Sequence, residues 1–198
     1  MTKLFSQPEG ATPITEEQRE GLLQKWVSIQ EELNQIERDN IIIGQRWLFN
    51  NRQKEADFAD INFIMNLHKT MFNKVYSWAG NLRTSQSNIG VTPYLIRPNT
   101  ASLKLDIQTW IDNEVYPADE IAIRYHHQLV CIHPFANGNG RLCRLMADYI
   151  NEQVFNGKPF SWGADDLYIQ GKARSTYLQA IYSANNNQIF DLVAFARS

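Results

Sequence analysis

Apolar residues in the first quarter of the chain recur at alternating spacings of four and three, the period of one buried face of an α-helix. The residues on this face are Leu22, Trp26, Ile29, Leu33 and Ile36. Thr15 to Gln18 has the form of a capping box, in which the two end side chains bond exposed amides of the first helical turn. We therefore predict that residues 15–49 are largely helical. Residues 1–14, with two prolines and a glycine, are predicted to be an extended lead-in.

The helical period returns along the rest of the chain, interrupted by glycine, proline or polar stretches. It predicts further helices at 58–74, from Thr100 onward, and at 118–132, 141–154, 164–184 and 188–197. One segment, 82–98, is instead rich in threonine, serine, asparagine and β-branched residues, with a turn signal from Asn88 to Gly90. We predict a short β-hairpin there that leans on the helices, because two strands alone are marginally stable in water. The pattern thus indicates a mainly α fold, with a single domain over residues 15–198.

The composition is that of an ordinary globular domain. The chain has 198 residues, 43 % of them hydrophobic, which is enough for one domain with its own core. A net charge of −2 argues against a general surface for nucleic acid or membrane. The N-terminus lacks the apolar stretch of a secretory signal, and no run of about 18 apolar residues predicts a transmembrane helix. Cys131 and Cys143 form no metal-binding pattern, so we expect reduced cysteines and a cytoplasmic protein.

The residues that carry chemistry lie between His133 and Arg144, in the order His-Pro-Phe-Ala-Asn-Gly-Asn-Gly-Arg-Leu-Cys-Arg. His133 follows a predicted helix, and a side chain at a helix exit can face a cleft. Phe135 is apolar in an otherwise polar loop, so we expect it to anchor the loop in the core. Gly138 and Gly140 can adopt positive φ, which turns successive amides inward as a nest for an anion.

The helix predicted after this loop adds to the anion site. Its N-terminus offers free amide groups and a favourable dipole for phosphate. Arg141 and Arg144 are neighbours at i and i+3, so both guanidinium groups can lie on one face. Two arginines beside an amide nest favour a polyphosphate, and His133 can accept a proton from the other side. We interpret the segment as a phosphate cradle with a histidine base. The alternative, a plain helix–loop–helix corner with solvated arginines, would fit a lone Gly-x-Gly better than this combination.

The segment resembles the Fic family motif, His-x-Phe-x-(Asp/Glu)-Gly-Asn-Gly-Arg-x-x-Arg, at every fixed position but one. Further parts of the resemblance are Trp78 to Gly80, Arg83, Asn40 with Ile41, and Tyr177 to Ala184. The resemblance covers roughly residues 15–197 and is strongest for the short group called mobile mystery protein B, a bacterial group whose motif also reads His-Pro-Phe-x-Asn-Gly-Asn-Gly-Arg. It implies a Fic-type helical bundle in which the hairpin at 82–98 is a flap.

The resemblance also implies an activity, the transfer of AMP from ATP to a tyrosine, threonine or serine hydroxyl of a target protein. His133 would be the general base that deprotonates this hydroxyl. Arg141 would hold the β- and γ-phosphates and stabilise the departing pyrophosphate, and Arg144 would grip the γ-phosphate. The anion nest would consist of Gly138, Asn139 and Gly140. The target would dock on the flap by main-chain pairing, at Thr84, Ser85, Asn88, Ile89, Gly90 and Val91.

The chain departs from the family motif at Asn137, where the family has an aspartate or glutamate that holds Mg²⁺ or Mn²⁺. Asparagine offers a neutral oxygen and loses one charge of attraction for the metal ion. AMP transfer is the first hypothesis. The alternatives are transfer of another phosphate-containing group, a non-catalytic nucleotide-binding module, and an interaction domain whose flap alone binds peptides. The nucleotide-binding module would belong to a toxin–antitoxin-like pair on a mobile element, with an antitoxin-like or DNA-binding partner protein.

Two further assignments concern regulation and the adenine base. Many Fic proteins carry an inhibitory helix that ends in Glu-Gly or Glu-Asn, and Glu20 with the next glycine matches this ending. Glu16 stands where that helix usually has serine or threonine, so ordinary acids in a first helical turn are the alternative interpretation of Glu20. Tyr177 is a candidate wall for the adenine, although aromatic residues at helical spacing more often belong to the core. We assign no role to His126 or His127.

Overall fold

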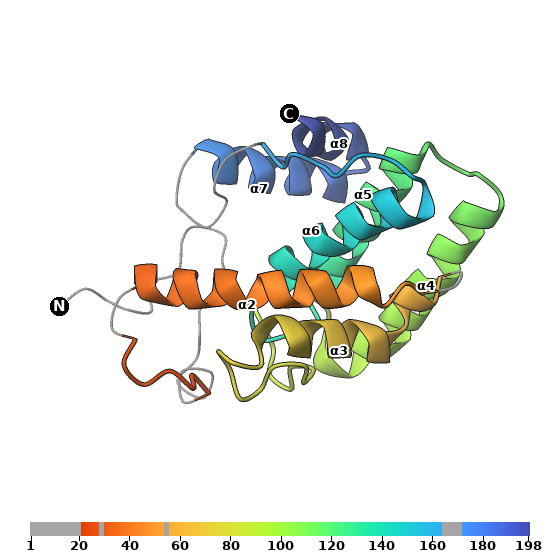
Figure 1. Ribbon diagram of the computed structural model, residues 1–198. Helices are drawn as coiled ribbons and strands as arrows, with labels where there is room; N and C mark the ends of the chain where they lie inside the picture. Colours follow the sequence, from red (N-terminus) through yellow and green to blue (C-terminus); the bar gives the residue numbers. More distant parts are fainter. Residues whose placement is uncertain (1–20, 28–29, 54–55, 164–171) are drawn as a thin grey trace.

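The computed structural model describes residues 21–27, 30–53, 56–163 and 172–198, and within these ranges the chain is mainly α-helical (Figure 1). The α-helices are α2 (Gln30–Asn50), α3 (Ile61–Phe72), α4 (Ile96–Asp112), α5 (Ala118–Ile132), α6 (Asn139–Tyr149), α7 (Lys172–Asn185) and α8 (Ile189–Arg197). The short 3₁₀ turns η1 (Asp57–Ala59) and η2 (Pro93–Leu95) precede α3 and α4, and a π-helical turn, η3 (Ile150–Val154), extends α6.

The pair formed by α5 and α6 is central to the arrangement (Figure 1). α2 lies along α3 on one side of this pair, α4 flanks α5, and α7 packs with α8 on the other side. The core between the helices is apolar, and its largest fully buried side chains include Phe58, Phe72, Tyr125, Phe135 and Tyr149. The loop that joins α5 to α6 lies against α3, where Gly138 is close to Phe72 and His68 bonds Asn137 O.

Local signals explain where the central helices begin. Asp60 caps α3, and its side chain accepts a hydrogen bond from Asn62 N at 2.8 Å. Pro117 precedes α5, whose first turn holds two acidic residues that complement the helix dipole. α6 begins directly after Gly138, which adopts a φ of 79°. None of the helices in the described ranges is both long enough and apolar enough to cross a membrane.

Most of the helices predicted from the hydrophobic pattern are confirmed. Those predicted at 58–74, 118–132, 141–154 and 188–197 correspond to α3, α5, α6 with η3, and α8. α7 matches the described part of the helix predicted at 164–184. α4 begins at Ile96, ahead of the predicted Thr100, because η2 opens with Pro93 and leads directly into it.

The helix predicted at 15–49 is confirmed only from Gln30 onward, and the prediction is wrong for residues 21–27. These residues form turns, and Leu22 pairs in antiparallel fashion with Tyr76. Backbone bonds to the chain around Tyr76 therefore replace helical ones. Two of them fix the pairing, Leu23 N to Val75 O at 2.9 Å and Ser77 N to Gly21 O at 2.8 Å.

Other N-terminal predictions have mixed outcomes. Trp26, predicted to face the core, is 62 % exposed because it lies in the turn segment rather than on a helix. Leu33 is buried and Ile36 packs against the core, as predicted. The predictions that lie outside the described residues are the lead-in at 1–14, the capping box at 15–18, the inward Ile29 and the inhibitory Glu20.

The β-hairpin predicted at 82–98 is wrong. Among the described residues this segment contains no strand, and it is irregular until it enters η2 and α4. The backbone amides of its two arms bond the end of α5 and the loop after it rather than each other. Arg83 N donates to Pro134 O at 3.0 Å, and Val91 N donates to Ile132 O at 3.3 Å. The end of α5 thus takes the place of a partner strand, and we call residues 83–91 the facing loop.

Candidate active site

His133 is the residue at which α5 ends. It adopts the left-handed conformation with a φ of 53°, which turns the chain sharply out of the helix. Its Nδ1 lies 3.4 Å from Val130 O, so the tautomer with hydrogen on Nδ1 fits this contact. Burial lowers the pKa of His133 to about 4, the bond to Val130 opposes this, and the charge of Arg83 adds to it. The imidazole is therefore neutral at pH 7, with a basic Nε2.

Arg83 fixes the backbone on both sides of His133. It is 6 % exposed, and its guanidinium donates to four backbone carbonyl oxygens. These are His133 O at 2.6 Å, Ser85 O at 3.1 Å, Ile132 O at 3.4 Å, and Val91 O. Two of the four belong to the end of α5 and two to the facing loop, so one buried side chain joins both. Arginine suits this position because its planar fork presents five donors.

Gly90 lets the facing loop lie directly against His133. Its φ is 107°, and a Cβ at this position would lie 2.5 Å from His133 Cβ and 2.7 Å from Arg83 Nη2. Both the conformation and the space therefore require glycine. The sequence analysis identified Gly90 as part of a turn and as a docking residue, but not as a neighbour of His133, which lies 43 positions further along the chain.

Asn139 closes the loop that follows His133. It is 2 % exposed, its Oδ1 accepts from Phe135 N at 2.9 Å, and its Nδ2 donates to Phe135 O at 2.7 Å. Phe135 is fully buried, so the predicted anchoring of the loop in the core is confirmed. The side chain of Asn139 thus serves the loop itself, and its backbone amide is the part that belongs to the first turn of α6.

His68 holds the same loop from α3, a role that the sequence predictions missed. Its Nδ1 accepts from Gly80 N at 2.9 Å, so Nε2 carries the hydrogen and donates to Asn137 O at 3.1 Å. The ring also stacks on Phe135, with 3.8 Å between the ring centroids. Burial lowers the pKa of His68 to about 3, which keeps the ring neutral. The available signal was a histidine on the apolar face of a predicted helix.

Gly138 and Gly140 do not share one role. Gly138 has positive φ, and a Cβ there would lie 2.6 Å from the ring of Phe72. Gly140 lies within the first turn of α6, where its φ is not positive, and the nearest atom to a Cβ would be Arg144 Nη1 at 3.6 Å. The predicted positive φ at Gly140 is therefore wrong, because α6 begins two residues earlier than predicted. The group best suited to bind an anion is therefore the N-terminus of α6 after Gly138.

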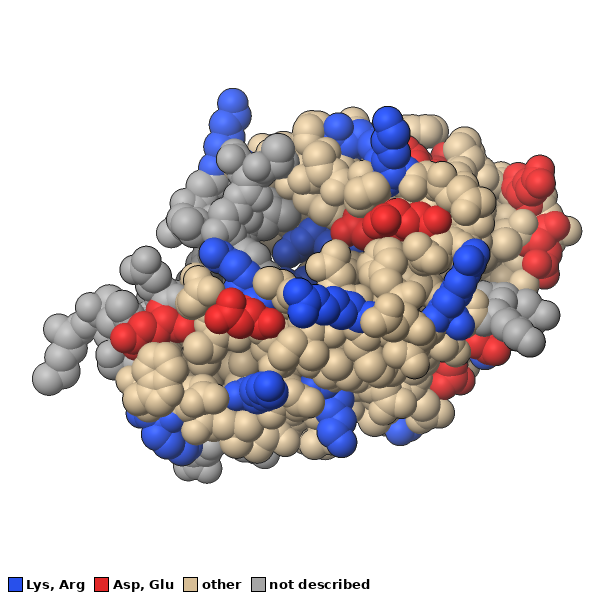
Figure 2. All heavy atoms as spheres, viewed as in Figure 1, with Lys and Arg blue, Asp and Glu red and all other residues tan. Residues whose placement is uncertain are grey.

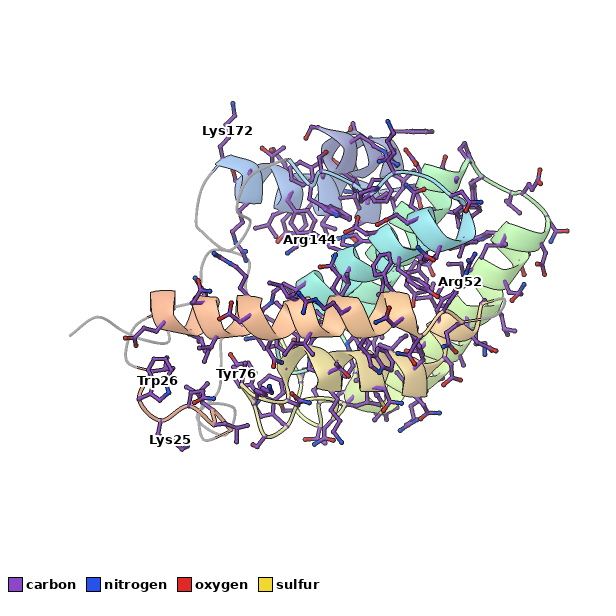
Figure 3. All side chains as sticks on the ribbon, viewed as in Figure 1. Lys25, Trp26, Arg52, Tyr76, Arg144 and Lys172 are labelled. Carbon is purple, nitrogen blue, oxygen red and sulfur yellow. The ribbon has the colours of Figure 1, made fainter. Side chains whose placement is uncertain are left out.

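The two arginines of α6 point to different neighbours. Arg141 pairs with Glu37 of α2 through both terminal nitrogens, and its guanidinium lies 4.8 Å from the centroid of the Phe72 ring. Arg144 lies over the ring of Tyr177 in α7, at 5.5 Å from its centroid. In Figure 3, Arg144 lies between α6 and α7. Figure 2 shows a hollow between α2 and α7 with lysine or arginine atoms inside it. A polyphosphate at the start of α6 would therefore meet one paired arginine and one facing α7.

Comparison with known proteins identifies this arrangement. Residues 58–150 match the model of the Fic/DOC family. By this match, the chain belongs to the Fic/DOC family. The Fic match contains His133, Gly138, Arg141 and Arg144, whereas Glu37 lies before it.

A named relative also supports the Fic assignment. The chain is 31 % identical over 150 residues to protein adenylyltransferase fic-1 of Caenorhabditis elegans, covering 73 % of this chain and 27 % of the relative. It thus spans only about a quarter of that protein.

Two solved Fic structures share the fold. The N-terminal Fic domain of a Bartonella quintana effector has a TM-score of 0.67 at 15 % identity, covering 100 % of this chain and 91 % of the other. BepC of Bartonella tribocorum, solved with bound AMPPNP, has a TM-score of 0.63 at 16 % identity, covering 92 % of this chain and 98 % of BepC.

The residues around Asn137 do not form a metal site of their own. Asn137 Oδ1 accepts a hydrogen bond from Gly138 N at 2.7 Å, so one of the two lone pairs of this neutral oxygen is already engaged. Within the described residues, no group of three or more histidine, cysteine, aspartate or glutamate side chains could hold a metal ion.

Tyr177 and the remaining histidines belong to the packing beside the site. Tyr177 is buried, and its hydroxyl lies 3.0 Å from Nε2 of the fully buried His126. Burial raises the pKa of Tyr177 to about 12. His127 Nε2 lies 2.8 Å from Asn185 Oδ1, beside the free Cys131. The structure thus brings Tyr177 next to Arg144 of the Fic motif, and gives His126 and His127 local partners outside it.

Proposed function

We propose that this Fic protein transfers AMP from ATP to a tyrosine, threonine or serine hydroxyl of a target protein. The observation that carries the proposal is a neutral, buried His133 held at the end of α5, one loop before the N-terminus of α6 and its two arginines. A base and an anion site so close together suit the attack of a hydroxyl on a phosphate. The adenylyltransferase name of the Caenorhabditis elegans relative supports the same reaction.

In the proposed reaction, the polyphosphate of ATP binds the first amides of α6, with Arg144 on the γ-phosphate and Arg141 on the β- and γ-phosphates. His133 Nε2 accepts the proton of the target hydroxyl as its oxygen attacks the α-phosphorus. A new P–O bond forms, and the bond from the α-phosphorus to the β-phosphate oxygen breaks. Pyrophosphate leaves with its charge stabilised by the arginines and by the amides of Gly138, Asn139 and Gly140. ATP enters as its Mg²⁺ or Mn²⁺ complex, and Asn137 is the candidate protein ligand of that ion.

The target is proposed to dock on the middle of the facing loop. Thr84, Asn88 and Ile89 are exposed, whereas the carbonyls of Ser85 and Val91 already accept from Arg83. Ile89 N and O also bond Ser87 Oγ, at 3.3 Å and 2.6 Å. Within the set predicted for docking, Thr84 and Asn88 are thus the better candidates for main-chain pairing with an extended segment.

The finer assignments remain part of the proposal. The asparagine at position 137 supports membership of the mobile mystery protein B group of bacterial mobile elements, with an antitoxin-like or DNA-binding partner that restrains the enzyme in the cytoplasm. The engaged oxygen of Asn137 also favours one second candidate, transfer of a different phosphate-containing group whose donor depends less on a metal ion.

The proposal is tested by mass spectrometry. The purified chain is mixed with ATP, Mg²⁺ or Mn²⁺ and bacterial lysate, with His133→Ala as the matched control. The expected result is an AMP-sized mass increment on tyrosine, threonine or serine that requires His133. ATP that stabilises the fold without any increment would instead support another donor or a non-catalytic nucleotide-binding module. Absence of both transfer and ATP-induced stabilisation would leave the interaction domain as the surviving hypothesis.

A further inference from the structure

Glu37 is a buried acid on α2 that the sequence predictions did not single out. It is 3 % exposed, although acids are rarely buried without a partner. Its carboxylate pairs with Arg141 at two points: Nη1 faces Oε2, and Nη2 donates to Oε1 at 3.0 Å. Oε1 also accepts a hydrogen bond from the Tyr76 hydroxyl at 2.9 Å. One carboxylate thus connects α2, α6 and the segment after α3.

The connection continues from Tyr76 to Asn137. The Tyr76 hydroxyl gives its proton to Glu37, and Asn137 lies within hydrogen-bonding reach of the same hydroxyl. Because Asn137 Oδ1 already accepts from Gly138 N, the amide NH₂ of Asn137 is the group that can donate to Tyr76. Burial raises the pKa of Tyr76 well above its usual range, and the charge of Glu37 adds to this. The hydroxyl therefore stays protonated, and the chain of donors runs from Asn137 through Tyr76 to Glu37.

We propose that Glu37 is a positioning residue for Arg141, and that Asn137 is matched to Glu37 through Tyr76. The proposal deepens the phosphate site of the proposed function and rests on it. Glu37 supplies the negative charge, Tyr76 donates to it, and position 137 must offer a proton. An acid at position 137 would have no proton for Tyr76 and would place a second negative charge beside this chain.

Burial favours a fixed contact between Glu37 and Arg141 over a reversible one. The two side chains are 4 % and 12 % exposed, and the ring of Phe72 lies beside the guanidinium. Separating such a pair leaves a buried charge without a partner, which is strongly unfavourable. ATP therefore meets Arg141 in the orientation that Glu37 sets, rather than displacing Glu37.

The ion pair also gives the two arginines different tasks. Glu37 balances the charge of Arg141, whereas the described part of the chain gives Arg144 no ion pair and places it on the ring of Tyr177. Arg144 and the N-terminus of α6 thus supply the net attraction for phosphate. Arg141 supplies donors in a fixed direction. Removing the charge of Glu37 will therefore leave the affinity for ATP intact and lower the rate of transfer.

The first test separates KM from kcat with Glu37→Gln, which keeps the shape of the side chain. Asp39→Asn is the matched control, because Asp39 is an exposed acid two residues further along α2. We expect Glu37→Gln to lower kcat by about tenfold or more, with the KM for ATP unchanged or lower. The control leaves both values unchanged. A kcat equal to that of the wild type overturns the proposal, and a higher kcat shows that Glu37 restrains the enzyme instead.

The second test needs no catalysis, so it separates this proposal from the proposed function. The melting temperature is measured for Glu37→Gln, for Asn137→Asp and for the two combined. Asn137→Asp is expected to lower the melting temperature. The combined variant is expected to melt at a higher temperature than the sum of the two single shifts predicts, because Tyr76 can then donate to the new acid. In the control, Asn137→Asp is combined with Asp39→Asn, and the two shifts in melting temperature are expected to add. Additive shifts in the Glu37 pair would refute the matching, whether or not the wild type transfers AMP.

Discussion

The loop between α5 and α6 and the facing loop lie against each other, yet they are held in different ways. The first is bonded along its length: Asn139 closes it at Phe135, and His68 donates to the carbonyl of Asn137. The second is held at its two arms by Arg83, and most of the residues between the arms are exposed. The difference separates a fixed loop that carries the Fic motif from a segment whose middle residues are mostly exposed.

This difference has a physical basis. A base and an anion site act together only if their spacing is maintained closely, so every polar group around them benefits from a fixed partner. A docking segment that pairs through its main chain needs exposed backbone groups, which internal bonds would occupy. We therefore expect substitutions to have large effects where the two loops are joined, smaller ones within the motif loop, and the smallest in the middle of the facing loop.

The largest effect is expected for Arg83→Met, which removes the clamp that joins the two loops. Four carbonyls lose a charged donor, and we expect a loss of transfer rate of about a hundredfold, roughly 3 kcal/mol in the activation free energy. The charge of Arg83 helps to lower the pKa of His133, so its removal raises that pKa. His133 is then protonated at a higher pH. The acid limb of the pH–rate profile therefore moves to higher pH. The measurement is the transfer rate as a function of pH.

Arg83→Lys is the matched variant for this experiment. It retains the positive charge but not the planar fork, so the rate is expected to fall while the acid limb stays in place. If both variants moved the acid limb equally, the charge of Arg83 would not be the cause. If neither lowered the rate, the clamp would not position His133. ATP-induced stabilisation is recorded in parallel to confirm that the anion site is intact.

An effect smaller than that of Arg83→Met is expected within the Fic motif. It is measured by comparing Gly138→Ala with Gly140→Ala. Alanine at 138 would strain a positive φ and press against Phe72, with an expected loss of about 2 kcal/mol in the free energy of unfolding. Alanine at 140 enters a helical turn where its Cβ would make only an ordinary contact with Arg144, so we expect no loss and a gain of up to about 1 kcal/mol. Urea unfolding of the two variants measures the difference. Equal losses would mean that Gly140 also has a required conformation.

The sequence predicted the elements that are specified locally. The helical period located α3, α5 and α8 within a few residues, and Pro117 marked the start of α5. It also brought His133, Gly138 and Arg144 into one short loop and helix, because these residues are close along the chain. The family match to residues 58–150 confirms the identity of that segment, while the role of each residue remains a prediction.

The failures concern features that depend on distant partners. Residues 82–98 have the composition of a hairpin, but their arms bond the end of α5, about 40 to 50 residues further along the chain. Glu37 and His68 are polar residues on helices, and periodicity gives no information about the distant groups that they contact. Both lie on buried helix faces, where a polar side chain needs a partner. That requirement is the signal that could have identified them as site residues.

The smallest effect on the fold is expected for Ile89→Ala, in the middle of the facing loop. Ile89 is 37 % exposed, so we expect a change below about 0.5 kcal/mol in the free energy of unfolding. The KM for the protein target is expected to rise several-fold, while the KM for ATP stays unchanged. Leu105→Ala on α4, where leucine is 70 % exposed, is the control for loss of surface apolar area and should change neither value. If Ile89→Ala instead destabilised the fold as much as Gly138→Ala, the facing loop would be rigid throughout, and the contrast between the two loops would not hold.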